Sequence, residues 1–443
     1  MVNVKIRLKK PTQMQVVALG YLAVMLVGTV LLVLPCSSRN ARWTGFTDAF
    51  MTSTSAACVT GLIPVNTYGH WSVFGQAVLL VLMQVGGLGI MTLMASFTRL
   101  LGRNMTLGER KLFMLSTGND SVGGVSRLIR SVLLYTFSFE AAGAIVLAAR
   151  FIPQHGAYGI WEAVFHSVSA FCNAGFDLMG KYGQSSLTGY AGDVTVNLVI
   201  MVLILCGGIG FIVWQDIFAC RFNPKKFALH TKVVLVMTGI LLFSGAVLFL
   251  VFEAGKTMPA GERILTAFFN SVTARTAGFN TVDFAEFSPA SVALMIILMI
   301  IGGAPGSTAG GIKVTTFVTL LAGTLASARQ VSATNIFRRR IDGDLVRQAS
   351  AIATIYFTVV SLGITAVAAI ERIDLISVTF EVVSALSNVG VTMGITGSLS
   401  AASKLILCLL MYFGRVGMIS LVIALAAKRE NIPISRPVEN LLL

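Results

Sequence analysis

The sequence has few charged residues. They make up 12% of its 443 residues, whereas hydrophobic residues make up 55%. A soluble globular protein of this length needs far more surface charge, so that class is excluded. The mean hydropathy of +0.83 is typical of a chain that crosses a membrane many times. No cleavable signal peptide is expected, because the apolar stretch that follows the basic start is long enough to span and no cleavage site stands out.

Residues that carry enzyme chemistry are scarce and scattered. The four histidines have no HExxH or other metal-ligand spacing, and the six cysteines fit neither a metal site nor a disulfide framework. There is no Walker motif, no dinucleotide-binding glycine motif after a strand, and no Ser/His/Asp constellation. We therefore expect no enzyme and no cofactor in this chain, so that any nucleotide regulation would come from another polypeptide.

Apolar stretches of about 20 residues, each long enough to cross a bilayer, recur along the chain. We predict eight spans, the sixth of them interrupted: 14–34, 71–99, 128–149, 194–218, 233–252, 291–326, 349–370 and 404–427. Lysine and arginine, 33 in all, fall mostly on one side of these spans. The positive-inside rule then places both termini in the cytoplasm. This distribution explains the net charge of +14, and a nucleic-acid partner is not expected.

A short semi-polar segment lies between the two spans of each pair, and the four segments resemble one another. They read STSAACVTGL at 53–62, SVSAFCNAGF at 167–176, SVTARTAGF at 271–279 and VVSALSNVGV at 382–391. Segments of about 10–14 residues are too short to span and suit a re-entrant helix. We predict an all-α polytopic membrane protein with four pseudo-symmetric repeats of span, pore helix, filter loop and span around a central pore. The predicted boundaries are 1–100, 101–220, 221–330 and 331–430, followed by a cytoplasmic tail at 431–443.

The four segments end at glycine turns that suit a cation. Glycine tolerates positive φ and lets the backbone approach an ion, whose water shell backbone carbonyls can replace. No carboxylate is present at the turns, which favours a large monovalent ion such as potassium over a divalent one. The predicted filter residues are Val59, Thr60, Gly61, Asn173, Ala174, Gly175, Thr276, Ala277, Gly278, Asn388, Val389 and Gly390, with potassium on the carbonyls of the four glycines. Ordinary connecting loops are the alternative. The third segment is one residue shorter, so its geometry is expected to differ.

Four acids lie near the starts of the short helices: Asp48, Glu162, Glu262 and Asp374. Two interpretations stay open. The acids complement the helix N-termini, or they form an outer vestibule that concentrates cations.

These features resemble the Trk/Ktr/HKT superfamily of potassium transporters, and most of all the KtrB-type membrane subunits of bacterial Ktr systems. The resemblance covers nearly the whole chain and implies potassium uptake across the bacterial cell membrane by a multi-pass protein. It also implies a homodimer and a KtrA-like RCK-type cytoplasmic subunit, an octameric ring that binds ATP or ADP. Glycine stands at all four filter positions, as in potassium-selective members, whereas some plant relatives carry serine at the first and favour sodium. Sodium stimulation, a sodium/potassium transporter of Trk or HKT type and a secondary transporter of an organic solute stay open.

The sixth span is interrupted by glycines and a proline, which cannot continue a helix comfortably. The resemblance implies a gate here that blocks the pore from inside; a kinked helix without a gating role is the alternative. The predicted gate residues are Gly302, Gly303, Ala304, Pro305, Gly306, Ser307, Thr308, Ala309, Gly310, Gly311 and Lys313, together with Arg415. Arg415 lies mid-span, where a cation is costly, and the resemblance implies that it contacts the gate and adds an electrostatic barrier. Arg275 is expected to brace the third filter turn, and the glycines at 86–89 and 207–210 to be packing points.

Overall fold

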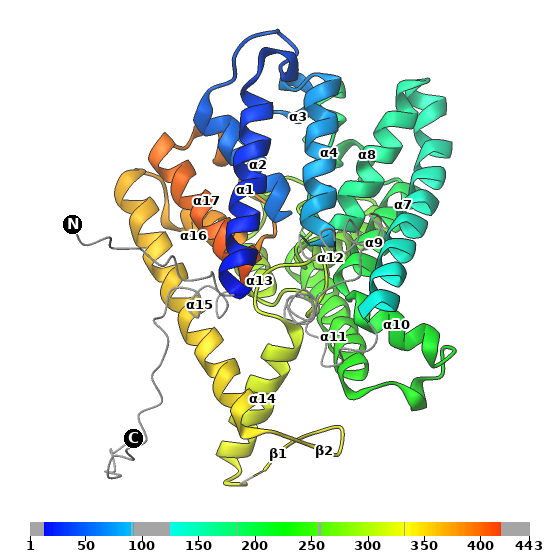
Figure 1. Cartoon of the computed structure of the whole chain (residues 1–443), viewed down its shortest axis with the longest axis vertical. Helices are drawn as coiled ribbons and strands as arrows, with labels where there is room; N and C mark the ends of the chain where they lie inside the picture. Colours follow the sequence, from blue (N-terminus) through cyan, green and yellow to red (C-terminus); the bar gives the residue numbers. More distant parts are fainter. Residues whose placement is uncertain are drawn as a thin grey trace, which may run out of the picture.

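The computed structural model of this chain describes residues 13–89, 92 and 125–417, except residues 184, 256, 257 and 332. Four of its helices are long and apolar enough to cross a membrane: α1 (Gln13–Val33), α7 (Val125–His155), α11 (Leu229–Phe252) and α15 (Gly343–Ile370). They correspond to the first span of each predicted repeat (Figure 1). The basic N-terminal residues and the tail at 431–443 lie outside the described residues.

A short helix follows each long one and packs against it. The four short helices are α2 (Phe46–Cys58), α8 (Tyr158–Cys172), α12 (Ala260–Thr273) and α16 (Leu375–Ser387), with 13, 15, 14 and 13 residues. They are too short to span a bilayer, as the sequence predicted. A long helix, its short helix, the turn that follows and the returning helix make up what we call a unit.

The returning helices are shorter than predicted. They are α4 (Val73–Leu88), α9 (Val194–Gly208) with α10 (Phe211–Ala219), α13 (Pro289–Ile300) with α14 (Val314–Ala328), and α17 (Ala401–Val416). The prediction of one continuous span over 194–218 was wrong, because α9 and α10 meet at an angle of 91°. Gly210 has φ +92°, and the N–H of Phe211 donates to Gly306 O at 3.0 Å instead of continuing the helix. Most of 89–99 and all of 418–427 lie outside the described residues.

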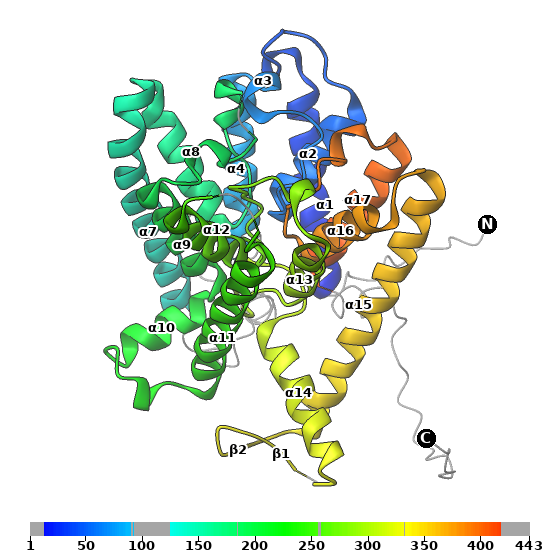
Figure 2. The same cartoon turned by 180° about the vertical axis from the view of Figure 1, so that it is seen from behind.

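The four units form a closed ring. Each short helix packs against the returning helix of the preceding unit: α8 against α4, α12 against α9, α16 against α13, and α2 against α17. Figures 1 and 2 show the short helices in the middle of the molecule, with long helices around them. The segments that follow the short helices are therefore brought together at the centre.

Short elements complete the described chain. They are the helix α3 (Thr67–His70), the 3₁₀ turns Pro35–Ser37, Met179–Tyr182, Thr188–Tyr190, Pro224–Lys226, Phe284–Glu286 and Thr396–Ser398, and the antiparallel hairpin β1 (Thr334–Ile336) and β2 (Arg339–Ile341). The hairpin joins α14 to α15 and lies at one end of the molecule, with α3 at the other (Figure 1). The helical prediction is thus confirmed, with this small hairpin as an addition.

Candidate functional site

Each short helix ends in a tight turn, and the chain that follows reaches the centre. Val59, Asn173 and Asn388 adopt the left-handed conformation, with φ of +57°, +59° and +53°. The N–H groups of the next residues then fold back onto the helix, as at Thr60, which donates to Ser55 O at 2.8 Å. Ala174 and Val389 donate in the same way to Ser169 O and Ser384 O, at 2.7 and 2.8 Å. These bonds satisfy the helix end from within its own unit.

The third turn has a different geometry, as its shorter sequence predicted. Ala274, the residue that follows α12, stays in the right-handed conformation. Thr276 adopts the left-handed one two residues later, with φ +69°. The N–H of Ala277 donates to Thr273 O at 3.1 Å, a tighter closure than in the other turns. The tighter closure therefore compensates for the shorter sequence of the third turn, and Gly278 still reaches the centre.

The glycines of the four turns, Gly61, Gly175, Gly278 and Gly390, form what we call the glycine ring. All four have positive φ, between +68° and +102°. A methyl group on Gly175 would lie 2.7 Å from Cα of Gly278, and one on Gly278 would lie 3.1 and 3.2 Å from the carbonyl oxygens of Val389 and Thr60. A methyl group on Gly61 would lie 2.9 Å from Ala174 O and 3.3 Å from Cα of Gly390. Only glycine permits this approach, so four backbone turns meet at one point.

The Asn388 side chain ties the ring between the fourth and first units. Its Nδ2 donates to Thr60 Oγ1 and to Met411 O, both at 2.9 Å. Thr60 and Asn388 are both fully buried. These two residues are therefore fixed relative to each other and to α17.

The loop at residues 301–313 lies directly against the ring and the end of α9. A methyl group on Gly310 would lie 2.6 Å from Ser387 O and 2.7 Å from Cβ of Asn388. The N–H of Ala304 donates to Gly208 O at 3.0 Å, and Thr308 N donates to Gly207 O at 3.3 Å. The loop thus fills the space beside the helix ends, and the carbonyls that α9 leaves unpaired are satisfied by it.

Three cationic side chains hold the 301–313 loop. Arg415 donates to Thr308 O and to Gly86 O, Arg275 to Gly302 O at 3.3 Å, and Lys313 to Ala309 O at 2.5 Å. Within the described ranges, none of the three forms an ion pair with a carboxylate. Arg275 was expected to brace the third turn, but its hydrogen bond goes to the loop. Backbone carbonyls are thus the partners of these three basic side chains beneath the ring.

Glycines of the returning helices are packing points, as predicted for Gly86 and Gly207. A methyl group on Gly86, Gly207 or Gly414 would collide with the carbonyl of Ala57, Phe171 or Leu386, near the end of the neighbouring short helix. A second set escaped sequence reasoning, namely a glycine in each long helix: Gly28, Gly143, Gly245 and Gly363. In three units this glycine faces the first serine of the repeat, and the serine hydroxyl donates to a long-helix carbonyl, as Ser167 does to Glu140 O at 2.6 Å. The recurrence of one such glycine in each long helix is the sequence signal that could have identified this set.

The four acids near the short helices do not share one environment. Asp374 caps α16 by accepting from Ser377 N at 2.9 Å, and Asp48 and Glu262 lie in the first turns of α2 and α12. These three positions agree with helix N-terminal complementarity. Glu162 lies one turn further in and is fully buried, where it meets His155 Nδ1 at 2.5 Å and accepts from Tyr182 at 2.8 Å.

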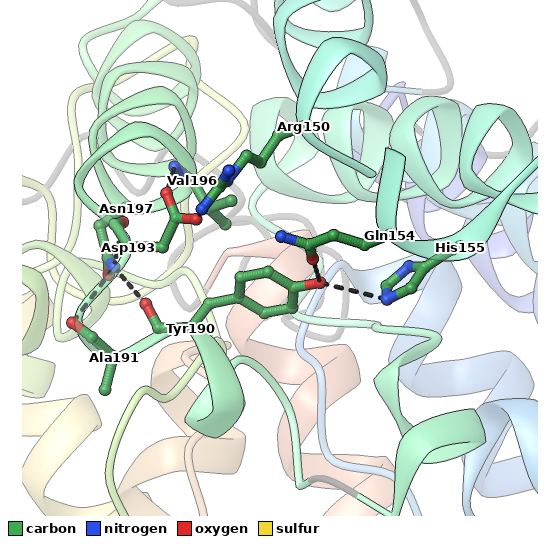
Figure 3. A network of polar contacts seen from close by, with 8 residues as sticks. All are labelled: Arg150, Gln154, His155, Tyr190, Ala191, Asp193, Val196 and Asn197. Carbon is green, nitrogen blue, oxygen red and sulfur yellow. Dashed lines mark hydrogen bonds and ion pairs between the residues drawn. The ribbon is translucent and has the colours of Figure 1, made fainter. Parts of the chain in front are cut away.

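A polar cleft of about 590 Å³ opens beside this acid, between the end of α7 and the start of α9. Figure 3 shows Arg150 turned toward Asp193, with Nε 2.6 Å from the carboxylate, and Tyr190 donating to Gln154 at 2.7 Å. Burial raises the pKa of Tyr190 to about 12, so its hydroxyl stays a donor. The polar groups of the cleft mostly satisfy one another, which indicates a structural clamp between α7 and α9.

The chain was compared with known proteins. Residues 3–432 match the family model described as "TrkH: Cation transport protein". The chain belongs to the TrkH family of cation transport proteins. It is therefore a transporter rather than an enzyme, as the sequence predicted. Two relatives of this TrkH-family chain are the Potassium/sodium uptake protein NtpJ of Enterococcus hirae (39% identical over 437 residues, 96% of this chain and 95% of the relative) and the Ktr system potassium uptake protein B of Bacillus subtilis (37% over 428 residues, 95% and 94%).

A solved structure supports the fold of this TrkH-family chain. The potassium transporter TrkH from Vibrio parahaemolyticus superposes with a TM-score of 0.76 over 95% of this chain and 86% of the other, at 22% identity. At this identity the likeness shows the fold alone. The predicted polytopic helical fold and the resemblance to Ktr-type proteins are both confirmed.

Proposed function

We propose that this chain is the ion-conducting subunit of a potassium uptake system. The support is the glycine ring, in which four turns of uncharged residues present backbone carbonyls around one point. Carbonyl oxygens can replace the water shell of a weakly hydrated cation. The proposed filter consists of the twelve residues predicted from the sequence, three per turn, with potassium on the carbonyls of the four glycines. The relatives are named as potassium uptake proteins, which supports potassium as the transported ion.

We further propose that the 301–313 loop is the gate. It lies against Asn388 and the end of α16, and its hydrogen bonds go to other units and to three cations. A positive charge beneath a cation filter opposes the passage of a second cation. Arg415 is proposed to act both as a tether of the loop and as this electrostatic barrier.

The orientation and organisation of the chain are part of the proposal. Both termini are placed in the cytoplasm and the short helices enter from outside, in the plasma membrane of a bacterium. The repeat boundaries remain those predicted from the sequence: 1–100, 101–220, 221–330 and 331–430, with a tail at 431–443. The support is the closed ring in which every unit repeats the same order of helices.

Partners are proposed from the relatives' names. Two relatives are named Ktr system potassium uptake proteins B and D, which indicates systems of several components. We propose a homodimer and a KtrA-like RCK-type cytoplasmic subunit, an octameric ring that carries ATP or ADP. One relative is named a potassium/sodium uptake protein, so we also propose that sodium stimulates uptake.

The test is rescue of a potassium-uptake-deficient bacterium at low external potassium, followed by tracer uptake of rubidium, potassium and sodium in proteoliposomes. We expect growth rescue and uptake that is faster for potassium and rubidium than for sodium. Uptake of sodium alone would favour a sodium transporter. Absence of any alkali-ion uptake by correctly inserted protein would overturn the proposal and favour an organic-solute transporter.

A further inference from the structure

One buried position behind each filter turn differs among the four units. The residue directly before the repeated segment is Thr52, His166, Asn270 or Glu381, and all four are buried. Thr52 donates to Asp48 O in its own helix, so it does not reach the chain beyond its turn. His166 reaches that chain only through a long contact, in which Leu178 N donates to Nε2 at 3.4 Å. Glu381 makes the most extensive contacts of the four.

Glu381 holds the chain that leaves the fourth turn. Its Oε1 accepts from Thr396 Oγ1 at 2.8 Å and also from Thr392 Oγ1, and the two threonine hydroxyls are 2.9 Å apart. Thr392 follows Gly390 by two residues, and its hydroxyl accepts from Gly394 N at 2.9 Å. The outer side of the fourth turn is therefore fixed to α16 by the carboxyl group of Glu381.

The inner side of the same turn has a second attachment. The N–H of Gly390 donates to Ser384 Oγ at 3.0 Å, and the first unit has the same bond from Gly61 N to Ser55 Oγ. The first unit lacks the outer attachment, because Thr52 bonds within its own helix. These two turns therefore differ at the carboxylate of Glu381, as well as at Asn388 in place of Val59.

The second oxygen of Glu381 has no partner within the described part of the chain. Oε2 is buried and makes no hydrogen bond, and no ion pair involves this residue. A buried polar atom left unsatisfied is costly.

We propose that Glu381 is a positioning residue for ion discrimination: through Thr392 its carboxylate holds the fourth filter turn in the geometry that separates potassium from sodium. The inference rests on the proposed function, since it needs the turn to contact the ion. Filter selectivity depends on the placement and field of the coordinating oxygens. A shift of the Gly390 backbone therefore changes the preference between ions, rather than only the amount of active protein.

The experiment compares Glu381→Gln, Thr392→Val and the double variant in proteoliposomes. Rubidium uptake is measured in competition with potassium or sodium, and the readout is the ratio of the two inhibition constants. We expect Glu381→Gln to lower the potassium preference about tenfold, the size of one hydrogen bond. Thr392→Val should lower the preference in the same direction, and the double variant should be no worse than Glu381→Gln, because both changes weaken the same contact.

Thr379→Val is the matched control, since Thr379 is a partly buried threonine of the same helix whose hydroxyl bonds within that helix, to Leu375 O. If Glu381→Gln inserts poorly, Thr392→Val tests the contact with the carboxylate intact. A uniform fall in uptake with an unchanged preference would show a merely structural role and overturn the inference. Failure of the proposed function is distinguishable, because the unmodified protein would then take up no potassium.

Discussion

The glycine ring and the 301–313 loop are both non-helical backbone at the centre of the molecule, yet they are held in different ways. Each of the four turns closes onto its own helix through backbone bonds such as Ala174 N to Ser169 O. The loop has bonds within itself, such as Gly302 N to Ile312 O, but it also bonds to residues of other units, such as Gly208, and to the side chain of Arg415. Elements held locally persist when neighbours move, whereas elements held by distant partners are released when those partners shift.

This difference supports the two proposed roles, ion selection at the glycine ring and gating at the 301–313 loop. A filter must keep its oxygens in place through every cycle, and the ring allows no added atom at its glycines. A gate needs two arrangements of similar free energy. Four hydrogen bonds to other units give the loop such a second option, because each can be exchanged for a bond to water.

The largest effect is expected from a methyl group in the ring. Gly175→Ala would place Cβ 2.7 Å from Cα of Gly278, which no side-chain rotation relieves, so we expect uptake to be abolished. Gly183→Ala is the matched control, because Gly183 has a similar φ of +73° but nothing within 4 Å of the added atom. Rubidium uptake by both variants, at equal amounts of inserted protein, is the measurement. Equal uptake by the two variants would contradict a close-packed ring.

The next largest effect concerns the loop. Arg415→Ala removes the bonds to Thr308 O and Gly86 O and removes the positive charge, so we expect cation flux to rise about tenfold. Arg415→Lys keeps the charge but cannot reach both carbonyls equally well, so its flux should lie between the two. Patch-clamp or tracer flux in the same lipid measures both. Unchanged flux in Arg415→Ala, at normal expression, would count against a barrier role.

Much of the fold could be predicted because its signals are local. Long apolar stretches, four similar segments and the glycines at 61, 175, 278 and 390 all follow from composition and spacing. The break at Gly210 could not be predicted, since it depends on a hydrogen bond from Phe211 to a loop almost 100 residues away. The sequence 207–210 looks like an ordinary packing motif, and only the partner Gly306 turns it into a bend.

The site itself shows the same limit. The residues of the proposed filter and gate stand out in the sequence as glycine-rich interruptions of apolar runs, and their roles stay predictions. Glu381 does not stand out, because a single acid in a semi-polar segment gives no sign of the two threonines that it binds. The glycines opposite the repeat serines escaped notice for a related reason: their contact is between helices.

A smaller effect is expected on the outer flank of the ring. Burial raises the pKa of Asp177, in the connection after the second turn, to about 6, although Met179 N donates to its Oδ1 at 2.9 Å. A carboxyl whose pKa is raised in the folded state loses stability as pH rises from its unfolded value, near 4, through 6. Asp177→Asn should therefore stabilise the protein above pH 6, by on the order of 2 kcal/mol, and have little effect at pH 4.

Thermal denaturation in detergent at pH 8 and pH 4 measures this difference. The control is Asp283→Asn, because Asp283 accepts from Ala285 N at 2.9 Å in the same local geometry but is exposed. We expect no pH-dependent gain from the control. If Asp177→Asn, like the control, gained no more stability at pH 8 than at pH 4, the outer flank of the ring would be open to water.

The smallest effect tests how the ring closes between its last and first units. Lys404 Nζ of α17 lies 2.9 Å from Asp48 Oδ1 of α2, a partly buried pair that joins residues 356 positions apart. Lys404→Met leaves the acid without its partner and should destabilise the protein by about 1–2 kcal/mol, whereas the double variant Asp48→Asn/Lys404→Met should recover part of the loss. Melting temperatures of the two variants decide this. If the glycine contacts chiefly hold the ring, both variants lose stability but keep their preference for potassium over sodium. A change in that preference would mean that the contact between the last and first units also shapes the proposed filter.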